Sequence, residues 1–124
     1  SEMCIRDRYM TENKRQTGSF YEDKAAEYLE SIGYDIICRN FYGKGGEIDI
    51  VAKDNEALVF VEVKYRSSVR YGFPEEAVDY RKQYRIRKTA MLYIARNGKS
   101  FDCPIRFDVI SILGTKITHI KDAF

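Results

Sequence analysis

The chain has 124 residues, of which 44% are apolar and 32% are charged, and its formal net charge is +2. This length fits one domain, and the composition is typical of a folded globular protein, which argues against disorder. No apolar run is long enough for a membrane helix or a secretory signal, so we expect a cytoplasmic protein with no membrane partner.

The predicted elements begin after a polar segment, residues 1–12, which we expect to be a disordered or non-native extension of a single domain over residues 13–124. Periodicity and turn residues predict the order αβββαββ, which indicates an α/β or α+β sheet flanked by helices. The predicted helices cover 19–32 and 75–97, and the predicted strands cover 34–41, 47–51, 60–64, 105–113 and 116–124.

The first predicted helix has residues typical of helix ends at both its start and its stop. Ser19 and Glu22 have the spacing of a capping box, and Gly33 follows the last apolar position. Glu22 therefore has a purely structural explanation, as the third residue of a capped helix.

Two strand-forming runs in the middle of the chain, "GEIDIV" and "FVEVK", carry charges at alternate positions. A turn at Asn55–Glu56 places Asp49 opposite Glu62 and Glu47 opposite Lys64 on one face of the hairpin. The other face would be wholly apolar, and it would contain Ile48, Ile50, Ala52, Val59, Val61 and Val63.

Two opposed carboxylates lie about 5 Å apart at Cβ and repel each other, so something must compensate for the charge of Asp49 and Glu62. A divalent cation does so, because Mg²⁺ takes one or two protein carboxylates and leaves positions for water and phosphate. Lys64 would add positive charge where a phosphate accumulates negative charge. The alternative is a solvent-exposed hairpin face with an ion pair between Glu47 and Lys64.

The second predicted helix ends at Asn97 and combines an apolar stripe with a basic arc. The stripe consists of Ile86, Ala90, Tyr93 and Ile94, and the arc of Arg81, Arg85 and Lys88, with Lys82 at its margin. From Lys64 to Lys99 there are ten Lys and Arg residues against three acidic ones. This segment indicates a polyanionic partner, although a solvated basic helix would have the same composition.

Asp49, followed after twelve residues by Glu62-x-Lys64, resembles the PD-(D/E)xK signature of restriction-endonuclease-like nucleases, which include archaeal Holliday-junction resolvases. Longer stretches, among them "GEIDIVAKD", "VFVEVKYR" and "HIKDAF", make residues 13–124 similar to the bacterial YraN family. The resemblance implies a restriction-endonuclease-like α/β core with a central mixed five-stranded sheet. Ile48 stands where the signature's name has proline.

The resemblance also implies site roles. Asp49, Glu62 and the Val63 carbonyl would hold Mg²⁺ or Mn²⁺, Lys64 would orient the attacking water, and Glu22 would be an additional catalytic acid. Glu47 and Gln83 are possible supporting residues, and Glu47 is alternatively the partner of Lys64. The expected nucleic-acid contacts are Arg66, Arg81, Lys82, Arg85 and Lys88.

The remaining polar and aromatic residues have open interpretations. Tyr65, Tyr71 and Phe73 would stack on unpaired bases or pack in the fold. Asp108 is expected to satisfy local hydrogen bonds or to pair with Arg106. The cysteines, Cys4, Cys38 and Cys103, lack metal-ligand spacing, and His119 fits a sheet or surface residue better than a catalytic base or a metal ligand.

The leading functional hypothesis is a metal-dependent endonuclease that cuts branched, flapped or single-stranded DNA, with DNA favoured over RNA. Junction cleavage would require two sites and hence a homodimer. The alternatives are a non-catalytic nucleic-acid-binding or recombination accessory module with the same fold, and an adaptor that binds an acidic protein through the basic helix.

Overall fold

The computed structural model describes residues 12–66, 78–98 and 103–124. The expectation for the N-terminal segment falls almost entirely on residues outside these ranges. The helices are α2 (Glu12–Ser31) and α3 (Tyr80–Arg96), and the strands are β1 (Asp35–Gly43), β2 (Gly46–Asp54), β3 (Ala57–Arg66), β4 (Ile105–Leu113) and β5 (Lys116–Ile120). Neither helix in these ranges is long and apolar enough to cross a membrane.

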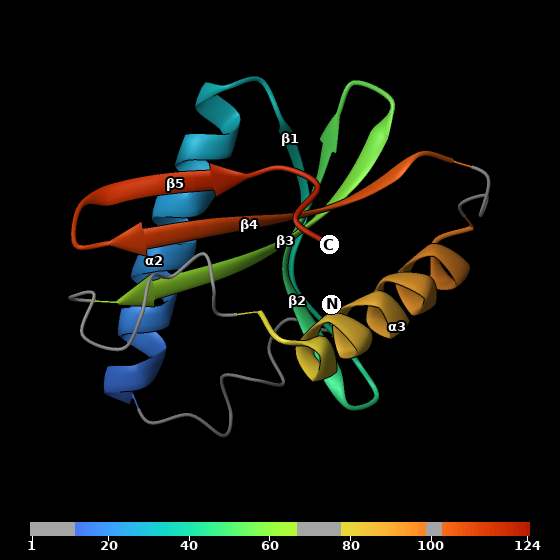
Figure 1. Ribbon diagram of the computed structural model, residues 1–124, viewed down its shortest axis with the longest axis horizontal. Coiled ribbons are helices and arrows are strands. Elements are labelled where there is room, and N and C mark those ends of the chain that lie inside the picture. Colours follow the sequence, from blue (N-terminus) through green and yellow to red (C-terminus); the bar gives the residue numbers. More distant parts are fainter. Residues whose placement is uncertain (1–11, 67–77, 99–102) are drawn as a thin grey trace.

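The five strands form one mixed sheet in the order β1-β2-β3-β4-β5, which confirms the predicted architecture. Neighbouring strands are antiparallel except β3 and β4, which run parallel and have α3 between them in the chain. Figure 1 shows the two helices on different sides of the sheet. The order αβββαββ and the helix-flanked sheet agree with the sequence.

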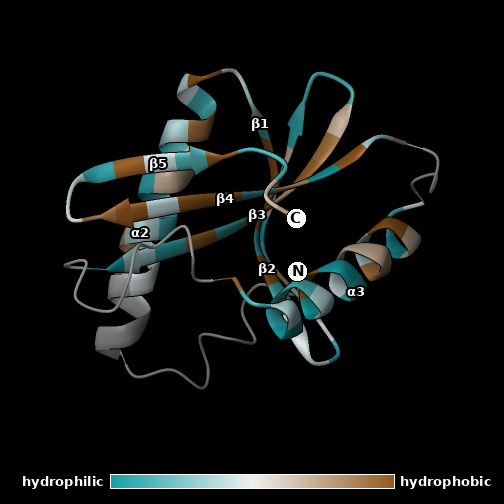
Figure 2. Ribbon diagram, in the orientation of Figure 1, coloured by the Kyte–Doolittle hydropathy of each residue, from teal (hydrophilic) through white to brown (hydrophobic). Residues whose placement is uncertain are grey.

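Each face of the sheet has its own apolar core. On one face, Ala25 and Leu29 of α2 pack with β-strand residues such as Ile50 and Val61. On the other face, the predicted α3 stripe packs with Val51 and Phe60. Figure 2 shows that the apolar residues concentrate in the inner strands, whereas α3 alternates between polar and apolar positions.

The predicted helix starts are wrong. Helix α2 begins at Glu12, so Ser19 lies inside the helix and cannot cap it. Helix α3 begins at Tyr80, and Asp79 is its N-cap, accepting a hydrogen bond from the Lys82 backbone N–H at 2.9 Å. The predicted stop of α3 at Asn97 is confirmed.

The last predicted strand is too long. Strand β5 ends at Ile120, and Asp122 has a positive φ of 53°, which turns the chain. The Ala123 backbone N–H then donates to the Phe107 carbonyl at 2.7 Å, and the Phe124 ring stacks on Phe107. These contacts favour a chain reversal over continued strand pairing.

The hairpin register is confirmed as far as the pair Ile50–Val61. Beyond it the ladder of β2 and β3 ends, and the Asp49 side chain accepts a hydrogen bond from the Val63 backbone N–H. Strand β2 continues with β1 through the pair Phe41–Ile48. Figure 1 shows the β1–β2 end of the sheet turning toward α3 while β3 runs on beside β4.

One part of the face assignment is therefore wrong. Ile48 packs with Phe41 and Phe60 on the α3 side, whereas the sequence placed it with Ile50 on the α2 side. The reason is that β2 separates from β3 at Asp49, so strict alternation between the faces does not persist across that point. The separation leaves the acidic residues where two strands diverge.

Candidate functional site

Asp49 and Glu62 lie together in the interior of the protein, with 7% and 4% of their surfaces exposed. Asp49 Oδ2 accepts the Val63 N–H at 2.8 Å. Burial raises the pKa of Asp49 well above its usual value, and the charge of Glu62 and a hydrogen bond with it raise the pKa further. The predicted juxtaposition of these two carboxyl groups is confirmed.

Two ammonium groups approach the same Glu62 oxygen. Lys82 Nζ of α3 lies 3.1 Å from Glu62 Oε2, and Lys64 Nζ of β3 lies 3.5 Å from it. Burial works against the charged form of Lys82, but the neighbouring Glu62 carboxylate outweighs it and raises the pKa of Lys82. In this structure Lys82 is therefore a partner of the acidic pair, as well as a candidate phosphate contact.

Glu22 belongs to the same acidic group, although it comes from α2. It is buried, with 6% of its surface exposed, and its charge contributes to the raised pKa of Asp49. Because α2 extends seven residues before Ser19, the capping explanation of Glu22 no longer applies. Its position beside Asp49 therefore needs a reason other than helix capping.

Arg39 of β1 is a neighbour of this group that the sequence reasoning missed. Its guanidinium lies 3.8 Å from Glu22 Oε1 and 2.7 Å from Asp23 Oδ1. It thereby joins the edge strand to α2 beside the acidic group. The signal was the positive charge of Arg39 in the middle of the largely apolar strand "DIICRNF".

The donor set fits a hard divalent cation. Carboxylate oxygens are the ligands that Mg²⁺ prefers, and one or two of them suffice because water and phosphate fill the other positions. Within the described ranges, no three Asp, Glu, His or Cys side chains form a ready enclosure for an ion. Asp49 and Glu62 are joined by a hydrogen bond, and Val63 is next to both.

A cavity of about 370 Å³ lies between the β1–β2 turn and the first turns of α3. Its lining includes Glu47, Lys82 and Arg85 together with glycines of the turn. Glu47 pairs across the strands with Tyr42, and its charge also raises the pKa of Asp49. The cavity therefore shares Lys82 with the acidic pair and has a basic wall.

The other predicted nucleic-acid contacts come from α3 and from the end of β3. Arg81, Arg85 and Lys88 are exposed on α3, and Arg66 is at the end of β3. Gln83 Nε2 donates to the Val78 carbonyl at 3.1 Å, so its amide supports the start of α3.

Of the three aromatic residues expected to stack on bases or to pack in the fold, the structure describes Tyr65. The Tyr65 ring stacks on Tyr21, with ring centroids 4.2 Å apart, and remains 43% exposed. Tyr71 and Phe73 lie outside the described residues. Packing therefore accounts for one face of Tyr65.

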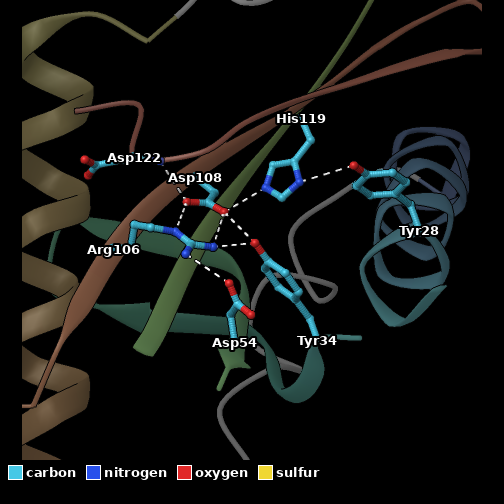
Figure 3. A network of polar contacts seen from close by, with 7 residues as sticks. All are labelled: Tyr28, Tyr34, Asp54, Arg106, Asp108, His119 and Asp122. Atoms are coloured by element: carbon cyan, nitrogen blue, oxygen red, sulfur yellow. Dashed lines mark hydrogen bonds and ion pairs between the residues drawn. The ribbon is translucent and has the colours of Figure 1, made fainter. Parts of the chain in front are cut away.

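A second polar cluster surrounds Asp108, which is fully buried (Figure 3). Its carboxylate accepts hydrogen bonds from Arg106 at 2.9 and 3.0 Å, confirming the predicted pair, and lies 2.7 Å from His119. The further members of the network are Tyr28, Tyr34, Asp54 and Asp122. His119 is a residue of β5 whose side chain is almost covered, and this cluster joins β2, β4, β5 and α2.

Comparison with known proteins assigns the chain to a family. The model of "Uncharacterised protein family UPF0102" matches residues 21–112. The chain belongs to the UPF0102 family. This assignment agrees with the YraN resemblance, and the matched residues include all of the acidic group together with Lys64 and Lys82.

UPF0102 proteins from several bacteria are similar to this chain. A UPF0102 protein of Lachnoclostridium phytofermentans is 50% identical over 112 residues, covering 90% of this chain and 95% of the relative. A UPF0102 protein of Persephonella marina is 49% identical over 106 residues, covering 83% and 88%. One of Enterobacter sp. is 42% identical over 113 residues, covering 90% and 86%.

Proposed function

We propose that this UPF0102 protein is a Mg²⁺- or Mn²⁺-dependent endonuclease that hydrolyses phosphodiester bonds in structured DNA. The observation that carries the proposal is the buried pair of Asp49 and Glu62, with the ammonium groups of Lys64 and Lys82 beside it. Burying two acids together destabilises a fold, so their presence supports a functional reason. The PD-(D/E)xK resemblance supplies the reaction class.

Asp49, Glu62 and the Val63 carbonyl would hold the cation. When bound, it would supply Lewis-acid stabilisation of the phosphate and lower the pKa of the attacking water. Hydrolysis forms a bond from the water oxygen to phosphorus and breaks the bond to the leaving sugar oxygen. Lys64 would orient the water and stabilise the negative charge on the phosphate, while Glu22 would accept a hydrogen bond from the water.

The basic residues support a nucleic-acid substrate. Phosphate contacts provide affinity without reading sequence, and the proposed contacts are Arg66, Arg81, Lys82, Arg85 and Lys88. Branched, flapped or single-stranded DNA is the proposed target, because shape and strand accessibility can then provide selectivity. Such an enzyme would work on DNA in the bacterial cytoplasm, and cleavage of junctions would require a homodimer.

The test is cleavage of labelled flap, four-way-junction and single-stranded DNA in buffers with Mg²⁺ or Mn²⁺. We expect Asp49→Asn and Glu62→Gln to reduce the rate at least 100-fold while DNA binding persists. Glu27→Gln is the matched control, since Glu27 is an exposed acid of α2. Wild-type protein that cuts none of these DNAs with either metal would contradict the proposal.

The second candidate is a non-catalytic nucleic-acid-binding module of the same fold. The observation in its favour is that Lys82 and Lys64 already compensate the charge of Glu62 within the structure. This candidate predicts metal-independent DNA binding by wild type, Asp49→Asn and Glu62→Gln alike, without cleavage.

A further inference from the structure

The outer face of α3 exposes two tyrosines to an unusual degree. Tyr80 is 87% exposed and Tyr84 is 62% exposed, although both are large aromatic residues. They are four residues apart on the helix, so both rings point outward on one side, with a rise of about 6 Å between them. The side of α3 that packs on the sheet consists of other residues, including Ile86 and Ala90.

The same helix is strongly basic. Between Tyr80 and Arg96 it has six Lys and Arg residues and no Asp or Glu. Among the exposed basic residues, Arg81, Arg85 and Lys88 lie near the tyrosines, and Lys88 Nζ is 5.3 Å from the centre of the Tyr84 ring. Two copies of such a face would repel each other, whereas a polyanion is attracted.

Exposed rings interleaved with cations are the features that bind unpaired nucleotides. Aromatic rings stack on the faces of bases, and Lys and Arg bind the phosphates between them. In a duplex the bases stack on one another, and side rings cannot reach their faces without unstacking. A face that only bound duplex phosphates would gain nothing from the two exposed rings.

We propose that the outer face of α3 binds single-stranded nucleic acid, with bases stacked on Tyr80 and Tyr84 and phosphates held by Arg81, Arg85 and Lys88. Lys82 is in the first turn of the same helix and contacts Glu62 at 3.1 Å from the side of α3 that faces the sheet, so the acidic pair lies at the same end of the helix as the two tyrosines. This inference deepens the proposed function, because it names an unpaired strand as the part of the substrate that is bound.

The test measures binding of a fluorescein-labelled 12-nucleotide oligo(dT) and of a 12-base-pair duplex to full-length Asp49→Asn protein in metal-free buffer. In this background, Tyr80→Leu and Tyr84→Leu should each weaken oligo(dT) binding about 5- to 100-fold, which corresponds to losing one stacked base. Duplex binding should change less than about twofold. Tyr80→Phe and Tyr84→Phe keep the ring and should retain affinity.

Phe20→Leu is the matched control, because Phe20 is an aromatic residue of α2 that is 52% exposed and lies outside the proposed face. It should leave oligo(dT) binding unchanged. Unchanged binding in both Tyr→Leu variants, or equal losses for single strand and duplex, overturns the inference. A dimer of the Asp49→Asn protein that dissociates on Tyr84→Leu substitution, seen by sedimentation, also overturns it in favour of a self-interface.

These results separate the inference from the proposed nuclease activity. Tyrosine-dependent binding of oligo(dT), together with no cleavage by wild type in Mg²⁺ or Mn²⁺, supports the binding face and contradicts the nuclease. Metal-dependent cleavage by wild type, with oligo(dT) affinity independent of both tyrosines, supports the nuclease and overturns the binding face.

Discussion

At the residue scale, Asp49 is a buried group whose ionisation the fold disfavours, and it is also part of the proposed site. Burial and the charges of Glu62, Glu22 and Glu47 raise its pKa, so the folded protein resists its ionisation. A group whose pKa is higher in the folded state than in the unfolded state lowers stability progressively as the pH rises above its unfolded value. Burying Asp49 therefore lowers the stability of the fold, as is common where a site must bind a ligand.

We expect Asp49→Asn to stabilise the metal-free protein at neutral pH by about 0.5–2 kcal/mol, because it removes the ionisable group. The gain should grow from about pH 4 upward, where the unfolded wild-type Asp49 ionises and the folded one does not. Urea denaturation of both proteins in EDTA between pH 4 and 8 measures it. A gain that is constant with pH would show that the charge of Asp49 is not its source.

Asp108 has the opposite behaviour. Burial alone would raise its pKa, but hydrogen bonds from His119 and Arg106 outweigh this and lower the pKa to about 2. A lowered carboxyl pKa contributes stability that is complete above the unfolded pKa, near 4, and is lost as the pH falls toward 2.

We therefore expect Asp108→Asn to destabilise the protein at pH 7 by about 2–3 kcal/mol, the value of a shift of roughly two pKa units. Between pH 4 and pH 2 the difference from wild type should shrink, because wild type loses this contribution as Asp108 becomes protonated. Denaturation curves across this range test the expectation. Asp54→Asn, at the rim of the same network, is a milder control with a smaller expected loss.

At the element scale, the position of α3 depends on glycines of the β1–β2 turn. A Cβ atom on Gly46 would lie 2.7 Å from Thr89 Oγ1 and 3.3 Å from the Arg85 carbonyl. The helix can approach the turn only because this side chain is missing. The same approach holds Lys82 near Glu62, so the local packing positions a site residue.

Gly46→Ala should destabilise the protein by about 1–3 kcal/mol, because the helix must move or the contact is overpacked. Replacing Thr89 with alanine removes the atom that clashes, so the Gly46→Ala/Thr89→Ala double variant should lose less than the sum of the single losses. Thermal denaturation of all four proteins in the cycle gives the coupling. Additive losses would show that the loss caused by Gly46→Ala does not come from the contact with Thr89.

The sequence predicts the elements with strong periodicity well. The apolar stripe of α3 and the turn at Asn55–Glu56 are determined by residues close together in the sequence. The turn then aligns Ile50 with Val61. Alternation along the hairpin was then enough to bring Asp49 and Glu62 together. The chain order of the elements and the strand bearing Asp108 follow from the same patterns, and the family resemblance implies a mixed five-stranded sheet.

The incorrect predictions concern features that depend on contacts between residues far apart in the sequence. The segment before Ser19 has no apolar repeat, yet it is helical because it extends a helix that is anchored further along, and extension is cheaper than nucleation. Ile48 faces α3 because β2 separates from β3 at Asp49, and a pattern of alternating apolar and polar residues does not predict this separation. The four residues that bind Asp108 are Tyr34, Arg106, His119 and Asp122, which come from separate parts of the chain, so single-sequence patterns predicted only Arg106 among them.

At the scale of the whole molecule, the acidic group and the Asp108 cluster are two separate polar features with different thermodynamic effects. The Asp108 cluster pairs its acid with cationic and neutral donors and stabilises the fold. The acidic group brings together Glu22, Asp49 and Glu62, whose charges repel each other. A bound cation would relieve that repulsion and couple metal binding to global stability.

We expect Mg²⁺ or Mn²⁺ to raise the Tm of the wild-type protein, and EDTA to reverse the rise. A cation at 100 times its Kd adds about 2.7 kcal/mol if it binds only the folded state. The Asp49→Asn/Glu62→Gln variant should show no shift. NaCl at equal ionic strength controls for screening, and a shift of the same size in the double variant would place the ion elsewhere.

The parallel pairing of β3 with β4 sets the order in which the protein can assemble. Strands β1, β2 and β3 are joined by short turns, but Glu62 lies beside Val109, which is translated much later. Closing so long a loop is slower than forming a hairpin. A chain emerging from the ribosome therefore presents Asp49 and Glu62 before β4 is available to pair with β3 and complete their surroundings.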